Sequence, residues 1–241
     1  MTGKDILERT RRILDDVIGE TTDKRWSDAY ILDDAANDAQ EDLCELCRGL
    51  IVDSTTAKDA ANLPICTLPV TANIQGVTSP YVATYAYSPY VLEIVRVKFA
   101  LQTKPTPKTT SAELDANWTN WQGADPGSPK NWSNDMNSKM ITFTPPPSAA
   151  DTANLTVWRL PLVKLSKNTP DISPEIPMIY HKALIPRILQ YCFEENDEET
   201  FRPKLAEKYE QRFIVWVERI KRELINQQRT VSTNSTRKAF T

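Results

Sequence analysis

Residues 25–43 read RWSDAYILDDAANDAQEDL and carry the clearest structural signal in the chain. Ser27 is suited to cap a helix, and Trp26 and Ile31 have the spacing of a hydrophobic staple across its start. Apolar residues then recur on one side of the helix, and acids occupy the other side. The pattern predicts an amphipathic helix of about six turns. Its apolar stripe contains Leu32, Ala35, Ala36, Ala39, Leu43, Leu46, Cys47 and Leu50, and its acids are Asp33, Asp34, Asp38, Glu41, Asp42 and Glu45.

A shorter helix is expected before this one. Thr2 and Asp5 have the spacing of a capping box, and apolar residues follow at three- and four-residue steps. Gly19 is well placed to end the helix, because glycine readily adopts the left-handed conformation found after helix ends. Both predicted N-terminal helices are therefore marked by a cap as well as by an apolar stripe.

Helices resume near the C-terminal end of the chain. The segment 176–195 is strongly apolar, and Pro186 within it predicts a kink or a break. An acidic turn follows at 194–199, and the last helix is expected from Pro203, a residue suited to a first helical turn, to about Gln228. Its apolar stripe contains Leu205, Tyr209, Phe213, Trp216, Val217, Ile220 and Leu224, and Glu218 and Arg222 form an ion pair on its wet face.

The middle of the chain has a different composition. It is rich in β-branched and aromatic residues separated by proline, asparagine, serine and threonine, which is typical of short antiparallel strands. Between them, the stretch 102–138 is long, polar and tryptophan-bearing, and such loops are usually functional or ordered by a partner. Five strands are predicted, at 66–72, 82–88, 91–101, 139–145 and 154–161.

The predicted fold class is α+β. An antiparallel helical bundle is formed by the N- and C-terminal segments, and an antiparallel β-domain is inserted between them. The bundle is expected to contain residues 1–62 and 170–228, and the β-domain residues 63–169. Residues 229–241 are polar and lack periodicity, so they are expected to form a flexible C-terminal tail.

Composition excludes several classes of protein. The chain has 241 residues, 40% of them hydrophobic and 25% charged, as in ordinary soluble globular proteins. The formal net charge of -3 argues against a broad basic patch for nucleic acid. No apolar run approaches the roughly 18 residues that span a bilayer, and the charged N-terminal segment does not resemble a secretory signal. Four cysteines are too few for a disulfide scaffold, which favours folding in a reducing cytoplasm.

Residues that would carry catalysis are scarce. His181 is the only histidine, and a nucleophilic triad would have to be built around it. No glycine-rich phosphate loop and no nucleophile elbow occurs. A packed or capping role for His181 is therefore expected, and the chain is predicted not to be an enzyme and to need no cofactor.

Cys44 and Cys47 have the C-x-x-C spacing of metal and redox sites. Both fall on the apolar side of the predicted amphipathic helix, where small hydrophobic side chains pack well. A zinc ion would need two further ligands, and only Cys66, Cys192 and His181 remain, without paired spacing. Core packing is the interpretation that this placement favours, and the runs of acids are interpreted as solvated helix faces and turns.

Trp118, Trp121 and Trp132 lie in the long polar stretch and have the chemistry to stack on bases or sugars. Only Lys130 supplies a nearby positive charge, which weakens the case for nucleic acid. We expect these residues to anchor the stretch on the β-domain or on a neighbouring subunit, since aromatic residues are enriched at interfaces. Contact with carbohydrate stays open as an alternative.

The order of these features resembles that of the phage head-to-tail adaptor proteins, also called connector or head-completion proteins. In those proteins a capped amphipathic helix, a β insertion with a proline-rich passage, an apolar helix, an acidic turn and a final aromatic helix follow one another. The resemblance covers nearly the whole chain. It is carried by Trp26, Ser27, Asp28, Ile31, Asn37, Ala39 and Leu43, by 142–147 and 155–160, and by Pro177, Tyr180, His181, Ala183, Leu184, Leu189, Cys192, Tyr209 and Phe213.

The resemblance implies a structural virion protein. Such adaptors form a ring, usually dodecameric, that docks under the portal protein and connects the capsid to tail or nozzle proteins. Genomic DNA passes through the channel without sequence-specific binding, and an acidic helix face suits a wall to which DNA does not adhere. The protein is therefore expected at the head–tail junction of the virion, after synthesis in the bacterial cytoplasm, and not in a membrane.

The resemblance also implies that the C-terminal tail reaches the portal. Arg229, Arg237, Lys238 and Phe240 are the predicted portal contacts, and an unstructured terminus is the alternative. Three other classes of protein remain as alternatives. A tail tube or tail-terminator ring protein would be dominated by strands, and a carbohydrate- or host-binding module would use the β-domain. A small hydrolase is disfavoured by the single histidine and the missing nucleophile motif.

Overall fold

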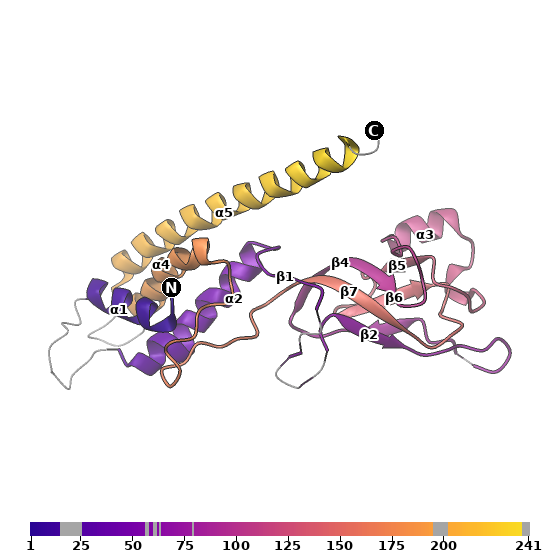
Figure 1. Ribbon diagram of the computed structural model, residues 1–241, viewed down its shortest axis with the longest axis horizontal. Coiled ribbons are helices and arrows are strands. Elements are labelled where there is room, and N and C mark those ends of the chain that lie inside the picture. Colours follow the sequence, from indigo (N-terminus) through magenta and orange to yellow (C-terminus); the bar gives the residue numbers. More distant parts are fainter. Residues whose placement is uncertain are drawn as a thin grey trace. The chain divides into compact units, whose positions relative to one another are not determined.

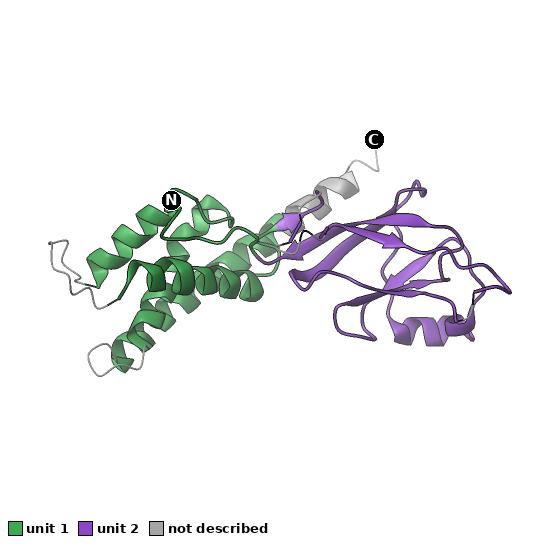
Figure 2. Cartoon of the chain, turned by 90° about the horizontal axis from the view of Figure 1, so that it is seen from below, with its two compact units in different colours: residues 1–51, 161–241 green, residues 52–160 purple. Residues whose placement is uncertain are grey.

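The computed structural model describes residues 1–14, 26–55, 58–59, 62, 64–78, 80–194 and 202–237, with side chains described as far as residue 227. The chain divides into two compact units (Figure 2). Residues 1–51 and 161–241 form a helical unit, and residues 52–160 form a β unit built on antiparallel sheets. The architecture is thus mixed α and β, with the β unit inserted between two helical stretches (Figure 1).

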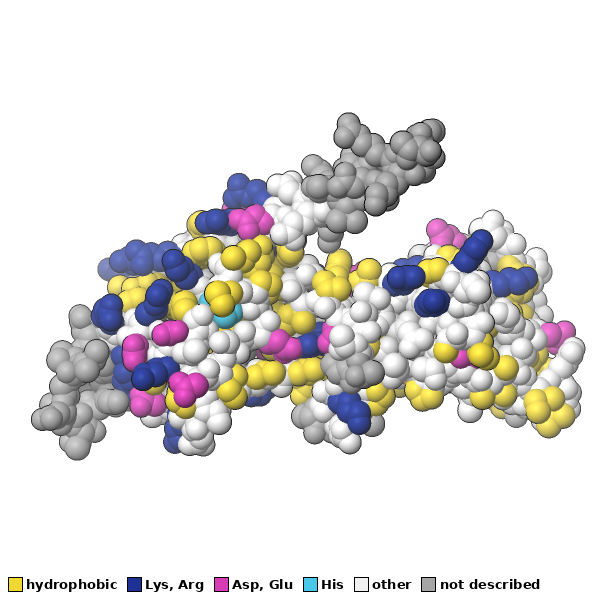
Figure 3. Space-filling model, viewed as in Figure 1, with side chains coloured by type: hydrophobic (Ala, Val, Ile, Leu, Met, Phe, Trp, Pro, Cys, Tyr) yellow, Lys and Arg dark blue, Asp and Glu magenta, His cyan; other side chains and the backbone are white. Residues whose placement is uncertain are grey.

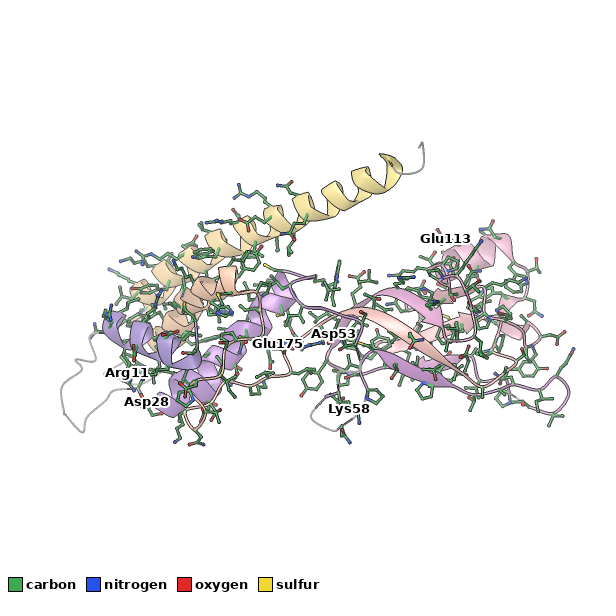
Figure 4. All side chains as sticks on the ribbon, in the orientation of Figure 1. Arg11, Asp28, Asp53, Lys58, Glu113 and Glu175 are labelled. Carbon is green, nitrogen blue, oxygen red and sulfur yellow. The ribbon has the colours of Figure 1, made fainter. Side chains whose placement is uncertain are left out.

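The helical unit begins with the predicted capped helix. Its α1 spans Gly3–Ile13, Thr2 N donates to Asp5 Oδ2 over 2.8 Å, and Asp5 N donates to Thr2 Oγ1 over 3.3 Å, so the capping box is confirmed. The expected helix end at Gly19 lies outside the described residues. From α1, Arg11 Nε donates to Asp28 Oδ1 over 2.7 Å, and the two labelled side chains point toward each other in Figure 4.

The amphipathic helix predicted from Ser27 is present but is not uniform. Ser27 Oγ accepts from Tyr30 N, as a cap should. The segment Tyr30–Ala35 is a π-helix, η1, and α2 follows at Ala36–Leu46. Ala36 N donates to Ile31 O, five residues back, rather than to Leu32 O as in a regular α-helix. The sequence pattern did not predict this local widening, because one wider turn inside a long helix hardly changes the spacing of the apolar residues.

Asn37 satisfies the backbone at the wide turn and extends the interaction to a distant segment. Its Nδ2 donates to Leu32 O over 3.1 Å, to Asp33 O over 2.7 Å and to Leu165 O over 2.9 Å. Its Oδ1 accepts from Leu165 N over 2.8 Å. Asn37 is 4% exposed. Its buried amide therefore holds the segment that follows the β unit against the N-terminal part of the helical unit.

Further side chains hold the returning segment, residues 161–176. Lys167 N donates to Asp33 Oδ1 over 2.7 Å, and Glu175 N donates to Gln40 Oε1 over 3.3 Å. On its other side, Gly3 N donates to Ile172 O over 2.8 Å. A stretch without helix or strand is thereby held between α1 and the face of α2 that carries Asn37.

The helix α4, Leu184–Glu194, is the centre of the helical unit. It packs against both α2 and α5 and lies between them in Figure 1. A 3-10 helix, η3, at Met178–Ala183 precedes it, and Pro186 lies in its first turn, so the predicted break is found on the N-terminal side of the proline. Its buried residues are Leu184, Ile185, Pro186, Ile188, Leu189, Gln190, Cys192 and Phe193.

The last helix, α5, spans Pro203–Arg237. Ala206, Tyr209, Phe213, Val217 and Ile220 are buried, close to the predicted stripe. The expected helix end at Gln228 needs correction, because the helix continues to Arg237 through most of the expected tail. Residues 238–241 of that tail lie outside the described residues. The apolar stripe stops earlier, but no glycine or proline interrupts the chain after Pro203, so nothing local ends the helix there.

The β unit contains two antiparallel sheets. In one, β7 (Asp151–Arg159) pairs with β4 (Val91–Phe99) on one edge and with β1 (Val52–Asp53) and β2 (Thr67–Val70) on the other. In the second, β6 (Met140–Thr144) lies between β3 (Thr84–Ala86) and β5 (Asn131–Ser133). All five predicted strands are confirmed. The very short β1 and β5 were not predicted, because two or three residues carry no periodic signal.

The unit boundaries fall at 51/52 and 160/161, whereas the sequence suggested 62/63 and 169/170. The first shifts because Val52 and Asp53 already pair with Trp158 and Val157 of β7. The second shifts because the chain after Leu160 is held by Asn37 and its neighbours rather than by a sheet. Neither interaction can be read from local composition.

The stretch expected as a long loop is ordered on the β unit. It contains α3 (Ser111–Asn117), a 3-10 turn η2 (Trp121–Gly123) and β5. Trp132 is 1% exposed and its Nε1 donates to Thr106 O over 3.0 Å; Trp121 is 6% exposed and its Nε1 donates to Asp115 Oδ1 over 2.7 Å. The prediction that the tryptophans anchor the stretch on the β-domain is confirmed for Trp132, which pairs with Phe143 of β6, and for Trp121, which lines a hollow together with Phe143. Trp118 is only partly buried, and its role stays a prediction.

A buried ion pair lies where the chain enters and leaves the β unit. Arg159 Nε, at the end of β7, donates to Asp53 Oδ2 of β1 over 2.8 Å, and both side chains are buried. Burial alone would raise the pKa of Asp53, but hydrogen bonds from Thr55 and Arg159 outweigh it and lower that pKa to about 2. The pair joins the two ends of the inserted unit.

Replacing Asn37 by alanine is expected to lower the free energy of unfolding by about 2–4 kcal/mol, because buried partners on both sides lose their hydrogen bonds. Denaturant unfolding followed by circular dichroism measures the change. The matched control is Asn168→Ala, since Asn168 is exposed. Equal stability of the two variants would contradict the role given to Asn37.

The pH dependence of stability tests the Asp53–Arg159 pair. The pKa of Asp53 is lower in the folded protein than the unfolded value of 3.8, so its charge stabilises the fold above that value. This contribution, ~2 kcal/mol, is lost as the pH falls toward about 2. Melting temperatures from about pH 5 to about pH 2 should fall more steeply for the unchanged protein than for Asp53→Asn. A variant at the exposed Asp125, Asp125→Asn, should leave the profile unchanged, and parallel profiles for all three would refute the assignment.

Candidate functional site

The residues first considered for chemistry lie inside the helical core. His181 is 3% exposed, with its Nδ1 lying 3.1 Å from Met1 O and its Nε2 lying 2.8 Å from Ile176 O. Each ring nitrogen therefore lies next to a backbone carbonyl group, and the expected packed role is confirmed. Within the described ranges, no group of three or more His, Cys, Asp or Glu side chains is arranged to hold a metal ion.

The C-x-x-C pair also belongs to the core. Cys44 and Cys47 are each 1% exposed, and Cys47 Sγ lies 3.7 Å from Val217 O of α5. Burial raises the pKa of the Cys47 and Cys66 thiols to about 11, which suppresses the reactive thiolate. The prediction of core packing is confirmed for this pair.

The β unit offers no aromatic platform at its buried tryptophans. A hollow of about 350 Å³ is lined by Tyr81, Trp121 and Phe143 among others, but Trp121 is almost fully covered. A second hollow of about 420 Å³, between β2 and β3, is lined by prolines and by Tyr85 and Tyr87. Sugar stacking needs an exposed ring face, and neither Trp121 nor Trp132 provides one.

The outer face of α5 carries positive charge. Lys204, Lys208 and Arg212 are exposed at four-residue steps, so they lie in one row along the helix. Val215, which is 64% exposed, continues the row. Figure 3 shows lysine and arginine side chains gathered over α5. We call Lys204, Lys208, Arg212 and Val215 the basic row.

Further along α5, positive charges are already paired. Arg219 Nε lies 2.9 Å from Glu223 Oε1, and Arg222 Nη2 lies 3.8 Å from Glu218 Oε2, which confirms the predicted Glu218–Arg222 pair. Arg212 lies over the Tyr209 ring, with its Cζ 5.1 Å from the ring centroid. The basic row was not identified from the sequence, although its four-residue spacing was a usable signal.

The outer face of η1 and α2 carries negative charge. Asp34, Asp38 and Glu45 are exposed one and two helical turns apart, on the side away from the buried Ala39 and Leu43. Partial burial and the neighbouring Glu41 carboxylate raise the pKa of Asp38, so charges on this face repel one another. We call Asp34, Asp38 and Glu45 the acidic row.

Two other acids of α2 are engaged within the unit. Asp42 Oδ2 accepts from Arg187 Nε of α4 over 2.6 Å and also from the Tyr191 hydroxyl, and burial together with that hydrogen bond raises the pKa of Tyr191. Glu41 pairs with Lys164 of the returning segment. The acidic face predicted from the sequence is therefore only partly free to meet another molecule.

The sequence matches the SU10 adaptor protein family over residues 1–239. The chain belongs to this family. Members of the SU10 adaptor family are phage head–tail adaptors, structural proteins and not known enzymes, which agrees with the buried His181 and cysteines. No curated protein matches the sequence. Among the residues described for this SU10-family chain, none of the helices is long and apolar enough to cross a membrane.

The predicted portal contacts of this SU10-family chain fall at its C-terminal end. Arg229 and Arg237 lie in α5, but their side chains are outside the described part. Lys238 and Phe240 lie outside the described residues altogether. The assignment of these four residues stays a prediction.

Thiol reactivity tests the structural role of the cysteines. All four are buried, so the folded protein should react with a thiol reagent roughly 100-fold or more slowly than the protein unfolded in guanidinium chloride. Colour release by an aromatic disulfide reagent measures both rates. Immediate labelling of Cys44 or Cys47 in the folded protein would contradict the core assignment.

Proposed function

We propose that this chain is the head-to-tail adaptor of a tailed phage, forming a ring that docks under the portal and connects the capsid to the tail. The observation that carries the proposal is the family match over residues 1–239. The division into a helical unit and an inserted β unit supports it, since one can contact sister copies while the other meets further virion proteins.

The ring surrounds the channel through which the genome passes. A dodecameric ring, as the resemblance implies, contains many copies of each contact, so contacts that are weak singly hold the assembly together. The net charge of -3 per chain gives such a wall no general attraction for DNA, which suits passage without sequence-specific binding.

The C-terminal part of α5 is the proposed portal contact. Ile220 is the last fully buried residue of α5 with a described side chain, yet the helix continues to Arg237, roughly 25 Å further at the rise of an α-helix. A helix that extends beyond its core has a surface available for a partner. Arg229, Arg237, Lys238 and Phe240 provide charge and one aromatic anchor.

Joining of heads and tails tests the function. Without this protein, infected cells should accumulate heads that carry no tails, and adding the purified protein to an extract of those cells should restore infectious particles. Plaque titre and electron microscopy measure the result. Normal joining in the absence of the protein would contradict the proposed function.

A truncated chain tests the portal contact. Deleting residues 228–241 should weaken binding to the portal protein about 10-fold or more while leaving the melting temperature unchanged, because residues 221–227, which precede the segment, are already outside the buried core. A matched pair of variants refines the result. Substituting alanine for Arg229, Arg237, Lys238 and Phe240 should reproduce the loss, whereas substituting it for Ser232, Asn234 and Ser235 should not. Unchanged binding by the truncated protein would refute the contact.

A further inference from the structure

The helical unit carries opposite charge on two outer faces. The acidic row lies on η1 and α2 and the basic row on α5, and both α2 and α5 pack on α4. α2 and α5 also approach each other. The Sγ of Cys47, directly after α2, lies 3.7 Å from Val217 O, and Arg187 of α4 contacts both Asp42 of α2 and the Phe213 ring of α5. Each row lies on the exposed side of its own helix, away from the residues which that helix buries.

The two rows also match in length. Lys204, Lys208 and Arg212 extend over ~12 Å of helix, and Asp34, Asp38 and Glu45 over ~16 Å, at the rise of an α-helix. The side chains of both rows are exposed, and the exposed Glu207 lies beside the basic row, three residues from Lys204. Two rows of opposite charge on the same chain are suited to a head-to-tail contact between copies.

We propose that neighbouring copies in the ring contact each other by placing the basic row of α5 on the acidic row of the next copy. The inference rests on the proposed function and names the contact from which the ring is built. A contact between two different faces repeats around a closed ring, whereas a contact of one face with itself would stop at a dimer. Val215, in the basic row, supplies apolar contact beside the charges.

In this contact the acidic face binds a neighbouring copy, whereas the sequence suggested that it lines the DNA channel. With Glu41 and Asp42 paired inside the unit, the remaining acids form a narrow row rather than a broad wall. Partial burial and the neighbouring Glu41 carboxylate already raise the pKa of Asp38, and lysine and arginine groups from a neighbour would relieve this repulsion. Duplex DNA is a poorer occupant of the basic row, since the paired Arg219 and Arg222 leave few cations to meet phosphates.

Reversing the charges of the two rows by substitution tests the contact. One variant carries Lys204→Glu, Lys208→Glu and Arg212→Glu, and the other carries Asp34→Lys, Asp38→Lys and Glu45→Lys. Each variant alone should assemble on the portal protein roughly 100-fold less well, because like charges then face each other. An equal mixture of the two should assemble again, in rings that alternate the variants, and a chain carrying all six changes should assemble alone.

The readout is the number of copies bound per portal ring by native mass, with an affinity tag on one variant to show that the other copurifies. Unfolding curves establish that each variant is folded. The matched control changes Arg96, Lys104 and Lys130, exposed cations of the β unit, to glutamate and should assemble normally. Raising the salt concentration should weaken assembly of the unchanged protein.

The possible results distinguish failure of the proposed contact from failure of the proposed adaptor function. Normal assembly of either reversed variant would overturn the contact while leaving the adaptor function in place. Loss in both variants without rescue by the mixture or by the sixfold change would also overturn it, because the rows would then face other partners. Loss of duplex DNA binding instead of ring assembly would assign the basic row to DNA. Failure of the unchanged protein to assemble on the portal would remove the proposed function and the contact together.

Discussion

The buried amide of Asn37 is the interaction on which the helical unit depends. It joins residues separated by more than half of the chain, since its partners are the carbonyl groups of the wide turn at 32–33 and both backbone groups of Leu165. A buried amide that uses both its donor and its acceptor stabilises one alignment of the two segments and penalises others, because any shift leaves polar groups unpaired. The inserted β unit can therefore be large without separating the two halves of the helical unit.

The same fixed alignment gives α4 its central place. Once the returning segment is held against α1 and α2, the chain enters η3 and α4 directly, and α4 is covered on both sides. The outer faces of α2 and α5 are then left for contacts with other molecules. A subunit of a ring needs two such faces at a fixed relation, and a well-packed helix between them provides that relation.

The sequence predicted what local rules determine. The Thr2 capping box, the cap at Ser27, five strands, the burial of Cys44 and Cys47 and the anchoring of Trp121 and Trp132 all follow from periodicity, capping and composition, and the structure confirms them. The features that were missed depend on distant partners or on missing stop signals. The wide turn at Tyr30–Ala35 is satisfied by Asn37, whose amide is itself held by Leu165 across the fold. β1 exists only because β7 is beside it, and α5 continues past Gln228 because no residue stops it.

The functional site was harder to predict than the fold for a physical reason. An adaptor acts through surfaces, and surface charges follow no periodic core pattern; the basic row becomes meaningful only when packing shows that it lies on the outer side of α5. The resemblance supplied the class, and the family match over residues 1–239 confirmed it.

The number of copies bound per portal ring, measured by native mass as the protein is titrated into the portal, tests the central claim most directly. A ring held by contacts between copies should fill cooperatively, so that empty portals and portals with one fixed, complete set of copies coexist at intermediate ratios. Single copies distributed at random over the portals, or no complex at all, would contradict a ring-forming adaptor.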